Sequence, residues 1–349
     1  MHIEMAGGDG MNQMQGEQSI CFANPVYFLG SASLVGKKEG EGPLGACFDR
    51  IQEDPTFGEE NWESAESAMQ KEVMEMAIAK AGIQKEELRM IFSGDLQAQS
   101  VASSFGLQEL ERPVYQLYGA CSTMGEALGL AAMAVAGGYA RYAAAVTSSH
   151  FASAEKEFRF PLEYGNQRPL SATWTVTGSG ACILGQKKGK AAVTGLTSGR
   201  IVDYGFKDSL NMGACMAPAA CDTICRNLQD FGYTLETYDQ IVTGDLGVVG
   251  KKILLDLLLK QGIDISDRYS DCGLLIFDNK TQDTHSGGSG CGCSASVFAS
   301  YILPKIERGE WKKVLFLPTG ALLSKVSYNE GKTIPGIAQG VIVEYMEDR

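Results

Sequence analysis

An internal repeat constrains the fold of this chain more than any other feature of its sequence. Residues 91–96 read IFSGDL, and residues 241–246, which lie 150 positions later, read IVTGDL. A second match, at a shift of 171 to 172 positions, relates Cys121 to Cys293, Gly138 to Gly309 and Arg141 to Lys312. The sequence therefore predicts two copies of one α/β unit.

Extended and helical patterns alternate along the chain in the order expected for an α/β protein. In the first half, we expect extended runs at 26–35, 90–93, 142–147 and 174–184, with helices at 65–81 and 123–136. In the second half, we expect extended runs at 191–202, 240–243, 313–318 and 340–345, with helices at 214–231, 248–261 and 294–306. We divide the chain into halves at 20–188 and 189–349, after a flexible tail at 1–19 that is rich in Gly, Met and Gln.

The net charge and the cysteines limit the partners and the compartment that this chain can have. The 30 Lys and Arg residues against 42 Asp and Glu residues give a net charge of −12, which repels nucleic acid and anionic lipid over most of the surface. The ten cysteines come without a signal-peptide pattern, so we expect free thiols in a reducing compartment. Because their spacing includes no C-x-x-C pair, we predict neither a metal site nor a cofactor. No apolar run approaches the roughly 20 residues of a membrane-spanning helix.

Cys121 is the strongest candidate for a reactive side chain. It lies in the turn GACST at 119–123, between an extended run at 113–118 and a helix of small residues. Unpaired N–H groups and the dipole at a helix N-terminus favour a thiolate, which is the form of a nucleophilic cysteine. A small buried residue in a tight turn is the equally weighted alternative.

Two histidines are possible partners of this cysteine, and a glycine-rich turn follows one of them. His150 follows the predicted strand at 142–147, and His285 precedes the segment SGGSGCG at 286–292. The repeat places both at strand or helix ends on the Cys121 side, where α/β sheets bind ligands, although a structural hydrogen bond in a loop explains either one. The glycine-rich segment lacks a Walker lysine, so we interpret it as a tight turn rather than a nucleotide site.

Aromatic and cationic residues concentrate between His150 and Trp174. They are Phe151, Lys156, Phe158, Arg159, Phe160, Tyr164 and Arg168, together with Gln167. Such a segment can receive a planar anionic ligand by stacking and by guanidinium hydrogen bonds. A subunit interface, where arginine and aromatic residues are enriched, is the slightly favoured interpretation, and the two are compatible.

These features together resemble the thiolase and 3-oxoacyl-synthase superfamily and, within it, a family of stage V sporulation proteins. The segments that carry the resemblance are SSHF at 148–151, FRFP at 158–161, WTVTG at 174–178, TGSGA at 177–181, GGSGCGCS at 287–294, TGALLS at 319–324 and IPGIA at 334–338. The resemblance covers residue 20 to the C-terminus. It implies a thiolase-like α/β fold with two pseudo-symmetric halves in five α-β-α-β-α layers, and a homodimer formed through the first half.

The same resemblance implies a function in sporulation. It suggests a subunit that binds dipicolinic acid and works with other subunits of a sporulation membrane system, which takes the acid, with calcium, into the developing spore. This subunit would be soluble and peripherally associated with the forespore or spore inner membrane. The alternatives are a Cys-dependent acyltransferase or condensing enzyme that uses coenzyme A, and a purely structural subunit.

The sequence departs from the condensing enzymes where their catalytic partners stand. In those enzymes a His after the second-half strand and an Asn or His in the next glycine-rich turn assist the cysteine. Here the two places read TGDL at 243–246 and GCG at 290–292, which leaves His285 as the one substitute and Cys121 with His285 as the candidate catalytic pair. We therefore expect binding rather than turnover.

We expect the ligand in one pocket with Cys121 at its base. The residues predicted to bind dipicolinate are Cys121, His150, Arg159, Arg168, Asp245, His285 and Cys291. The helix N-terminus at Cys121 would supply N–H donors for the carboxylates. Asp245 would repel the free dianion but would coordinate the calcium of its chelate.

Overall fold

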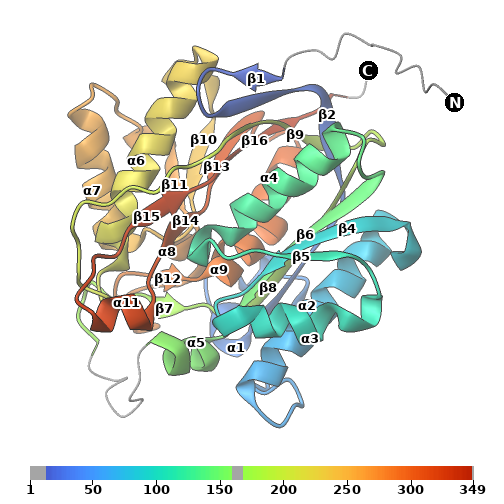
Figure 1. Cartoon of the computed structure of the whole chain (residues 1–349), viewed down its shortest axis with the longest axis horizontal. Helices are drawn as coiled ribbons and strands as arrows, with labels where there is room; N and C mark the ends of the chain where they lie inside the picture. The colour runs from blue at the N-terminus through green and yellow to red at the C-terminus, as the bar shows by residue number, and fades with distance from the viewer. Residues whose placement is uncertain (1–12, 159–167, 348–349) are drawn as a thin grey trace, which may run out of the picture.

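The computed structural model describes residues 13–158 and 168–347 and has the thiolase-like architecture (Figure 1). One continuous 12-stranded mixed sheet folds into two halves, called here the two sheets, which alternate with three layers of helices and give the five layers that the resemblance implies. Helices α6 (Met212–Phe231) and α7 (Gly247–Leu259) cover one outer face, and α2 (Trp62–Ala81) and α3 (Val101–Leu107) cover the other. Between the sheets lie α4 (Thr123–Ala136) and α9 (Cys291–Val297).

The two sheets have the same topology, which confirms the predicted duplication. The first half contributes β2 (Ser19–Gly36), β4 (Leu88–Gly94), β5 (Val114–Gln116), β6 (Tyr142–Ser149) and β8 (Gly178–Gly185), in the order β5-β4-β6-β8-β2. The second half contributes β9 (Ala191–Thr197), β10 (Gln240–Thr243), β11 (Tyr269–Asp271), β13 (Lys313–Leu317) and β16 (Gly340–Tyr345), in the order β11-β10-β13-β16-β9. In each sheet the second strand pairs in parallel with its two neighbours, and the remaining pairs are antiparallel.

The outer helices repeat the duplication down to their ends. Helix α2 begins after Asn61, whose side chain accepts a hydrogen bond from a first-turn N–H, and ends at Gly82 with φ of 64°. Helix α6 begins after Asn211 in the same way and ends at Gly232 with φ of 63°. Asparagine satisfies the free N–H groups of a first turn, and glycine adopts left-handed φ at no steric cost. Both pairs of caps lie 150 positions apart, the same shift that relates β4 to β10.

Strand β2 joins the two sheets. Its 18 residues pair with β9 from Ser19 to Tyr27 and with β8 from Tyr27 to Val35. The composition of residues 1–19 predicts a flexible tail. The structure instead has β1 (Met14–Gln15) paired with β2, and the Asp230 carboxylate accepts hydrogen bonds from the N–H groups of Glu17 and Gln18 at 3.1 and 3.0 Å. Residues 1–12 lie outside the described residues.

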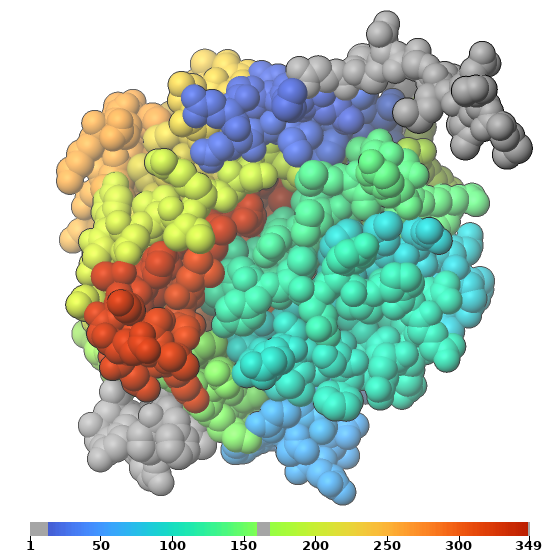
Figure 2. All heavy atoms as spheres, in the orientation of Figure 1, coloured from blue at the N-terminus to red at the C-terminus, as the bar shows by residue number. Residues whose placement is uncertain are grey.

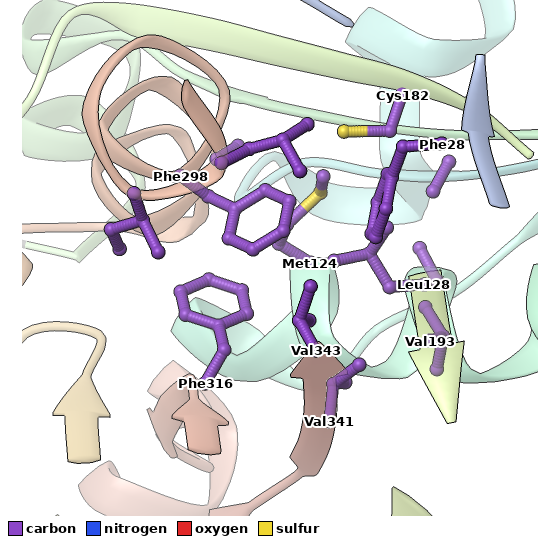
Figure 3. Close-up of a cluster of buried hydrophobic side chains, with 14 of the residues drawn as sticks. Phe28, Met124, Leu128, Cys182, Val193, Phe298, Phe316, Val341 and Val343 are labelled. Carbon is purple, nitrogen blue, oxygen red and sulfur yellow. The ribbon is translucent and has the colours of Figure 1, made fainter. Parts of the chain in front are cut away.

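The central layer is held by apolar packing between the two sheets. Figure 3 shows Phe298 between Phe28 and Phe316, with ring centroids 5.5 and 4.5 Å apart. Small side chains let the central helices approach closely, since a Cβ on Gly180 of β8 would lie 2.3 Å from the Ala295 carbonyl oxygen of α9. The helix expected at 294–306 continues from α9 through a π-helical turn (Phe298–Ile302) into α10 (Leu303–Glu307).

Short elements complete the molecule around the strand ends. They are α1 (Lys37–Gly40), β3 (Arg50–Gln52), α5 (Phe151–Phe158), β7 (Trp174–Thr175), α8 (Cys272–Ile276), β12 (Gly288–Ser289), β14 (Thr319–Ala321), α11 (Lys325–Asn329) and β15 (Gly336–Ala338). The run expected to be extended over 174–184 is divided into β7 and β8, because β7 leaves the large sheet to pair with β12. Edge strand β5 and α3 lie on the face shown in teal in Figure 2.

Candidate functional site

Cys121 lies in a tight turn between β5 and α4. A single helical turn at Ala120–Ser122 precedes α4, and Ala120 has a positive φ of 51°. The Ser122 hydroxyl donates to the Gly119 carbonyl at 2.7 Å, and the Thr123 hydroxyl donates to the Ala120 carbonyl at 2.6 Å. These bonds fix the turn and place the Cys121 side chain in the interior, where the residue is 6% exposed.

A buried carboxyl group faces this thiol. Asp245 follows β10 of the second half and accepts hydrogen bonds from the Gly290 N–H at 2.9 Å and the Thr319 hydroxyl at 3.0 Å. The Cys121 thiol lies close enough to this carboxyl group for each to shift the pKa of the other. Burial raises the pKa of Asp245 to about 7.

The Cys121 thiol is not activated in this setting. Burial raises its pKa well above the usual value, and the nearby Asp245 carboxylate raises it further. From the sequence, a thiolate favoured by the helix N-terminus is one of two interpretations of Cys121. The structure differs because full burial and the carboxyl neighbour outweigh the helix dipole, whose effect is confined to about one turn.

Cys291 joins Cys121 from the opposite half. It begins α9, and its thiol donates to the Ser148 carbonyl of β6 at 2.9 Å. The two cysteines pack in one apolar cluster with Leu96 and Ala154. Cys293, which the repeat matched to Cys121, lies within the first turn of α9, with its thiol 3.8 Å from the Gly244 carbonyl.

A second buried carboxylate network lies behind Cys291, in the first half. Glu66 of α2 accepts hydrogen bonds from the hydroxyls of Ser148 and Ser153 at 2.9 and 2.8 Å and from the Gln97 amide at 2.7 Å. Burial, together with the charge of Asp95, raises the pKa of Glu66 to about 7. Glu66 was not among the residues predicted from the sequence. The one available signal was indirect: its neighbour Asp95 lies in the repeated segment at 91–96.

The cavity beside Cys121 is small and apolar. It measures about 30 Å³, and its walls include Leu96, Tyr118, Phe158, Met212 and Leu323. A cavity of about 150 Å³ is what binds a benzene ring, so this space accommodates water rather than an aromatic acid.

A much larger groove lies on the other side of α5. It measures about 1100 Å³ and is lined by residues of α1 and α5 and by His150, Arg168 and Trp174. Ala154 and Phe158 of α5 line the small cavity, whereas Phe151 of the same helix lines the groove. Helix α5 therefore separates the predicted ligand residues into two groups, with Cys121, Asp245 and Cys291 in one and His150 and Arg168 in the other.

His285 is not among the residues that surround Cys121. Its Nδ1 hydrogen-bonds to the Pro169 carbonyl at 2.9 Å, and its Nε2 lies 3.0 Å from an Asp283 carboxylate oxygen. Asp283 also pairs with Arg168 at 3.3 Å and lines the groove. His285 therefore contacts a residue that lines the groove. The sequence had predicted it in one pocket with Cys121, and this prediction is wrong. Arg159 lies outside the described residues.

The imidazole of His150 also hydrogen-bonds to the protein backbone. Its Nε2 hydrogen-bonds to the Pro55 carbonyl at 2.8 Å, and burial lowers its pKa, so the ring is neutral around pH 7. The described residues contain no group of three or more His, Cys, Asp or Glu side chains that could hold a metal ion. In the same parts of the chain, no helix has the length and apolar character needed to cross a membrane.

Comparison with known proteins gives one family and one fold. Residues 16–344 match the family model described as Stage V sporulation protein AD. The protein of that name from Bacillus subtilis (strain 168) is 40% identical over 332 residues, covering 95% of this chain and 98% of the relative.

Two solved structures show the fold alone. 3-Oxoacyl-[acyl-carrier-protein] synthase III from Aquifex aeolicus VF5 has a TM-score of 0.56 at 14% identity, covering 92% of this chain and 100% of that one. Cerulenin-bound OleA from Xanthomonas campestris has a TM-score of 0.59 at 14% identity, covering 93% and 98%.

Proposed function

Because this chain belongs to the Stage V sporulation protein AD family, we propose that it is a subunit that binds dipicolinic acid. In this proposal it works with other subunits of a sporulation membrane system that takes the acid, with calcium, into the developing spore. The family supports the role in sporulation. The ligand, the uptake step and peripheral association with the membrane are the parts that we propose.

The contact between Cys121 and Asp245 carries the argument for binding over catalysis. Acyl transfer through a cysteine requires a thiolate and a base that accepts its proton. Here the thiol faces a carboxyl group that disfavours its ionisation. Both described histidines, His150 and His285, hydrogen-bond to backbone carbonyls elsewhere. The site therefore lacks the imidazole partner of the acyltransferase alternative.

Direct binding measurements test this function. Isothermal titration of the purified chain with dipicolinate, with and without calcium, should show saturable binding, and picolinate, which lacks one carboxylate, should bind more weakly. Acyl-CoA should neither compete nor be turned over. Thiolysis or condensation of acyl-CoA that disappears in Cys121→Ala would contradict the proposal and favour the acyltransferase.

We also propose a homodimer formed through the first half. Strand β5 is an edge strand, with Tyr115 51% exposed, and Phe105 of the adjacent α3 is 62% exposed. Unpaired edges and exposed aromatic patches are features of association surfaces. Sedimentation velocity should give a dimer, and Tyr115→Lys should shift the equilibrium towards the monomer; a wild-type monomer at all concentrations would contradict it.

A further inference from the structure

We propose that a basic strip at the end of the molecule opposite Cys121 binds an extended acidic segment of a partner protein. Three segments form the strip, at 137–141, 186–190 and 305–313. Helix α4 runs from Cys121 towards this end, and its 14 residues place the strip about 20 Å from the thiol (Figure 1). The inference goes beyond the proposed function, because it names a second surface and does not depend on dipicolinate.

The three segments of the strip form one surface because the strands that they connect are neighbours. Tyr142 of β6 pairs with Gly185 of β8, which brings the segment at 137–141 next to the one at 186–190. The carbonyls of Lys190 and Lys312 accept hydrogen bonds at 2.8 Å from two consecutive N–H groups at the end of β16. The end of β16 therefore joins the second segment to the third.

The charge of the strip is opposite to that of the chain as a whole. Among the described residues, the strip and the strand ends that touch it carry eight cations and five acids, whereas the whole chain has 30 and 42. The cations are Arg141, Lys187, Lys188, Lys190, Lys305, Arg308, Lys312 and Lys313, and the acids are Asp239, Glu307, Glu310, Glu344 and Glu347.

Salt bridges compensate only part of this positive charge. Glu310 pairs with Lys305 at 2.7 Å and with Arg308 at 2.6 Å, and Glu344 pairs with Lys313 at 3.1 Å. The other five cations of the strip form no salt bridge with any residue that the structure describes. They therefore present a local positive field on a chain whose net charge is −12.

Aromatic rings position two of these five cations without neutralising them. Lys312 Nζ lies 3.9 Å from the ring centroid of Tyr345, and Arg141 Cζ lies 5.0 Å from that of Tyr142. A cation over a ring keeps its full charge, whereas a cation in a salt bridge shares its field with a carboxylate. An anion that binds cations already held in place costs little side-chain freedom, so the strip is suited to a carboxylate partner.

The surroundings of the strip favour a narrow partner over a flat one. Exposed acids lie on both sides of it, with Glu86 and Glu87 before β4 and Asp264 and Asp267 before β11. Because charges are screened within about 8 Å at physiological salt, a partner responds mainly to the residues that it touches. A bilayer of anionic lipid would cover these flanking acids as well as the strip, whereas an extended chain would follow the strip alone. The partner chemistry that fits is therefore a run of aspartate or glutamate residues.

Binding of fluorescein-labelled decaglutamate, followed by fluorescence anisotropy, tests this inference. The wild type should bind the peptide saturably, and its affinity should fall as the salt concentration rises. The strip variant combines Lys187→Gln, Lys188→Gln and Lys190→Gln, and should bind roughly tenfold more weakly.

The matched control removes the same number of charges outside the strip. It combines Lys207→Gln, Lys252→Gln and Lys332→Gln, which are exposed lysines that lie elsewhere on the surface. Its net charge equals that of the strip variant, so its affinity for decaglutamate should stay within about twofold of the wild type. Circular dichroism of both variants ensures that weak binding is not caused by unfolding.

Three outcomes would overturn the inference. The first is a wild type that does not bind decaglutamate, and the second is an equal loss of affinity in the strip variant and the control. The third comes from sedimentation with vesicles of phosphatidylglycerol and phosphatidylcholine, in which the wild type should stay in the supernatant. If it sediments with the vesicles and the strip variant does not, the strip binds a lipid surface instead.

The proposed function is tested separately from the strip. The strip variant should bind dipicolinate as the wild type does, measured by isothermal titration, because the strip lies at the other end of α4 from Cys121. A strip variant that loses dipicolinate binding would contradict the separation of the two surfaces. A wild type that binds decaglutamate but no dipicolinate would leave the strip in place and refute the proposed function.

Discussion

The two halves place an aspartate after the same strand and then use it differently. Asp95 follows β4 and Asp245 follows β10, and both are fully buried. Asp95 accepts hydrogen bonds from Gln97 and Ser103, which belong to its own half. Asp245 accepts hydrogen bonds from Gly290 and Thr319 of its own half, but it also faces the Cys121 thiol of the other half. The duplicated fold thus places the two aspartates at equivalent positions. The loops around each one determine whether its contacts come from its own half or from the other.

Alanine at each aspartate gives the largest expected effect. Asp95→Ala leaves the Gln97 N–H and the Ser103 N–H and hydroxyl without their acceptor, and Asp245→Ala does the same to the Gly290 N–H and the Thr319 hydroxyl. Each should lower the free energy of unfolding by about 2 to 4 kcal/mol, measured by urea denaturation. If the free energy of unfolding fell by less than about 1 kcal/mol for only one of the two variants, the two aspartates would not have equivalent structural roles.

The pH dependence of stability should be a property of both halves. Burial raises the pKa of Asp245 and of Glu66 to about 7, whereas both titrate near 4 in the unfolded chain. The folded state therefore binds protons that the unfolded chain has released, so stability is higher at about pH 6 and is lost as pH rises through about 7.

Each of these groups should contribute on the order of 1 kcal/mol between about pH 6 and pH 8. Asp245→Asn and Glu66→Gln should each reduce the slope of unfolding free energy against pH by a similar amount. A protein that is more stable at the higher pH would show that the buried carboxylates are not protonated.

Thiol reactivity should show the smallest effect and the clearest difference between the halves. Asp245→Asn removes the carboxylate charge that raises the pKa of Cys121 and should increase alkylation of Cys121 by iodoacetamide roughly fivefold. Asp95→Asn should leave that rate unchanged, because Asp95 is bonded within its own half. The rate is followed by mass spectrometry of the Cys121 peptide, and equal rates in both variants would contradict the assigned contact.

The sequence predicted regular elements well where pattern and caps agreed. Helix α4 and strands β10 and β16 have the predicted bounds, because apolar runs there end at glycine or polar residues. The predicted flexible tail is in fact ordered from residue 13 onward, because Asp230, more than 200 positions away, binds the N–H groups of Glu17 and Gln18. Nothing in the composition of residues 13–18 indicates that Asp230 binds them.

The candidate site was less predictable for the same physical reason. Lys38 and Glu39 have no periodic pattern of their own, and only folding brings Lys38 and Arg168 over one tryptophan ring. The state of Cys121 was also beyond local reasoning, since the helix N-terminus is adjacent in sequence whereas Asp245 is contributed by the other half. Local sequence can identify a candidate reactive side chain. Its pKa, however, depends on residues that long-range packing brings next to it.

Strand β2 has a consequence for the order in which the molecule is made. Its residues from Ser19 to Tyr27 pair with β9, whose first residue is Ala191, so this early strand waits for one synthesised about 170 residues later. Contacts of such long sequence separation slow folding and leave a strand edge open to wrong partners in the meantime. A chain that stops at the end of the first half would keep the β2–β8 pairing but would leave the N-terminal part of β2 without its β9 partner.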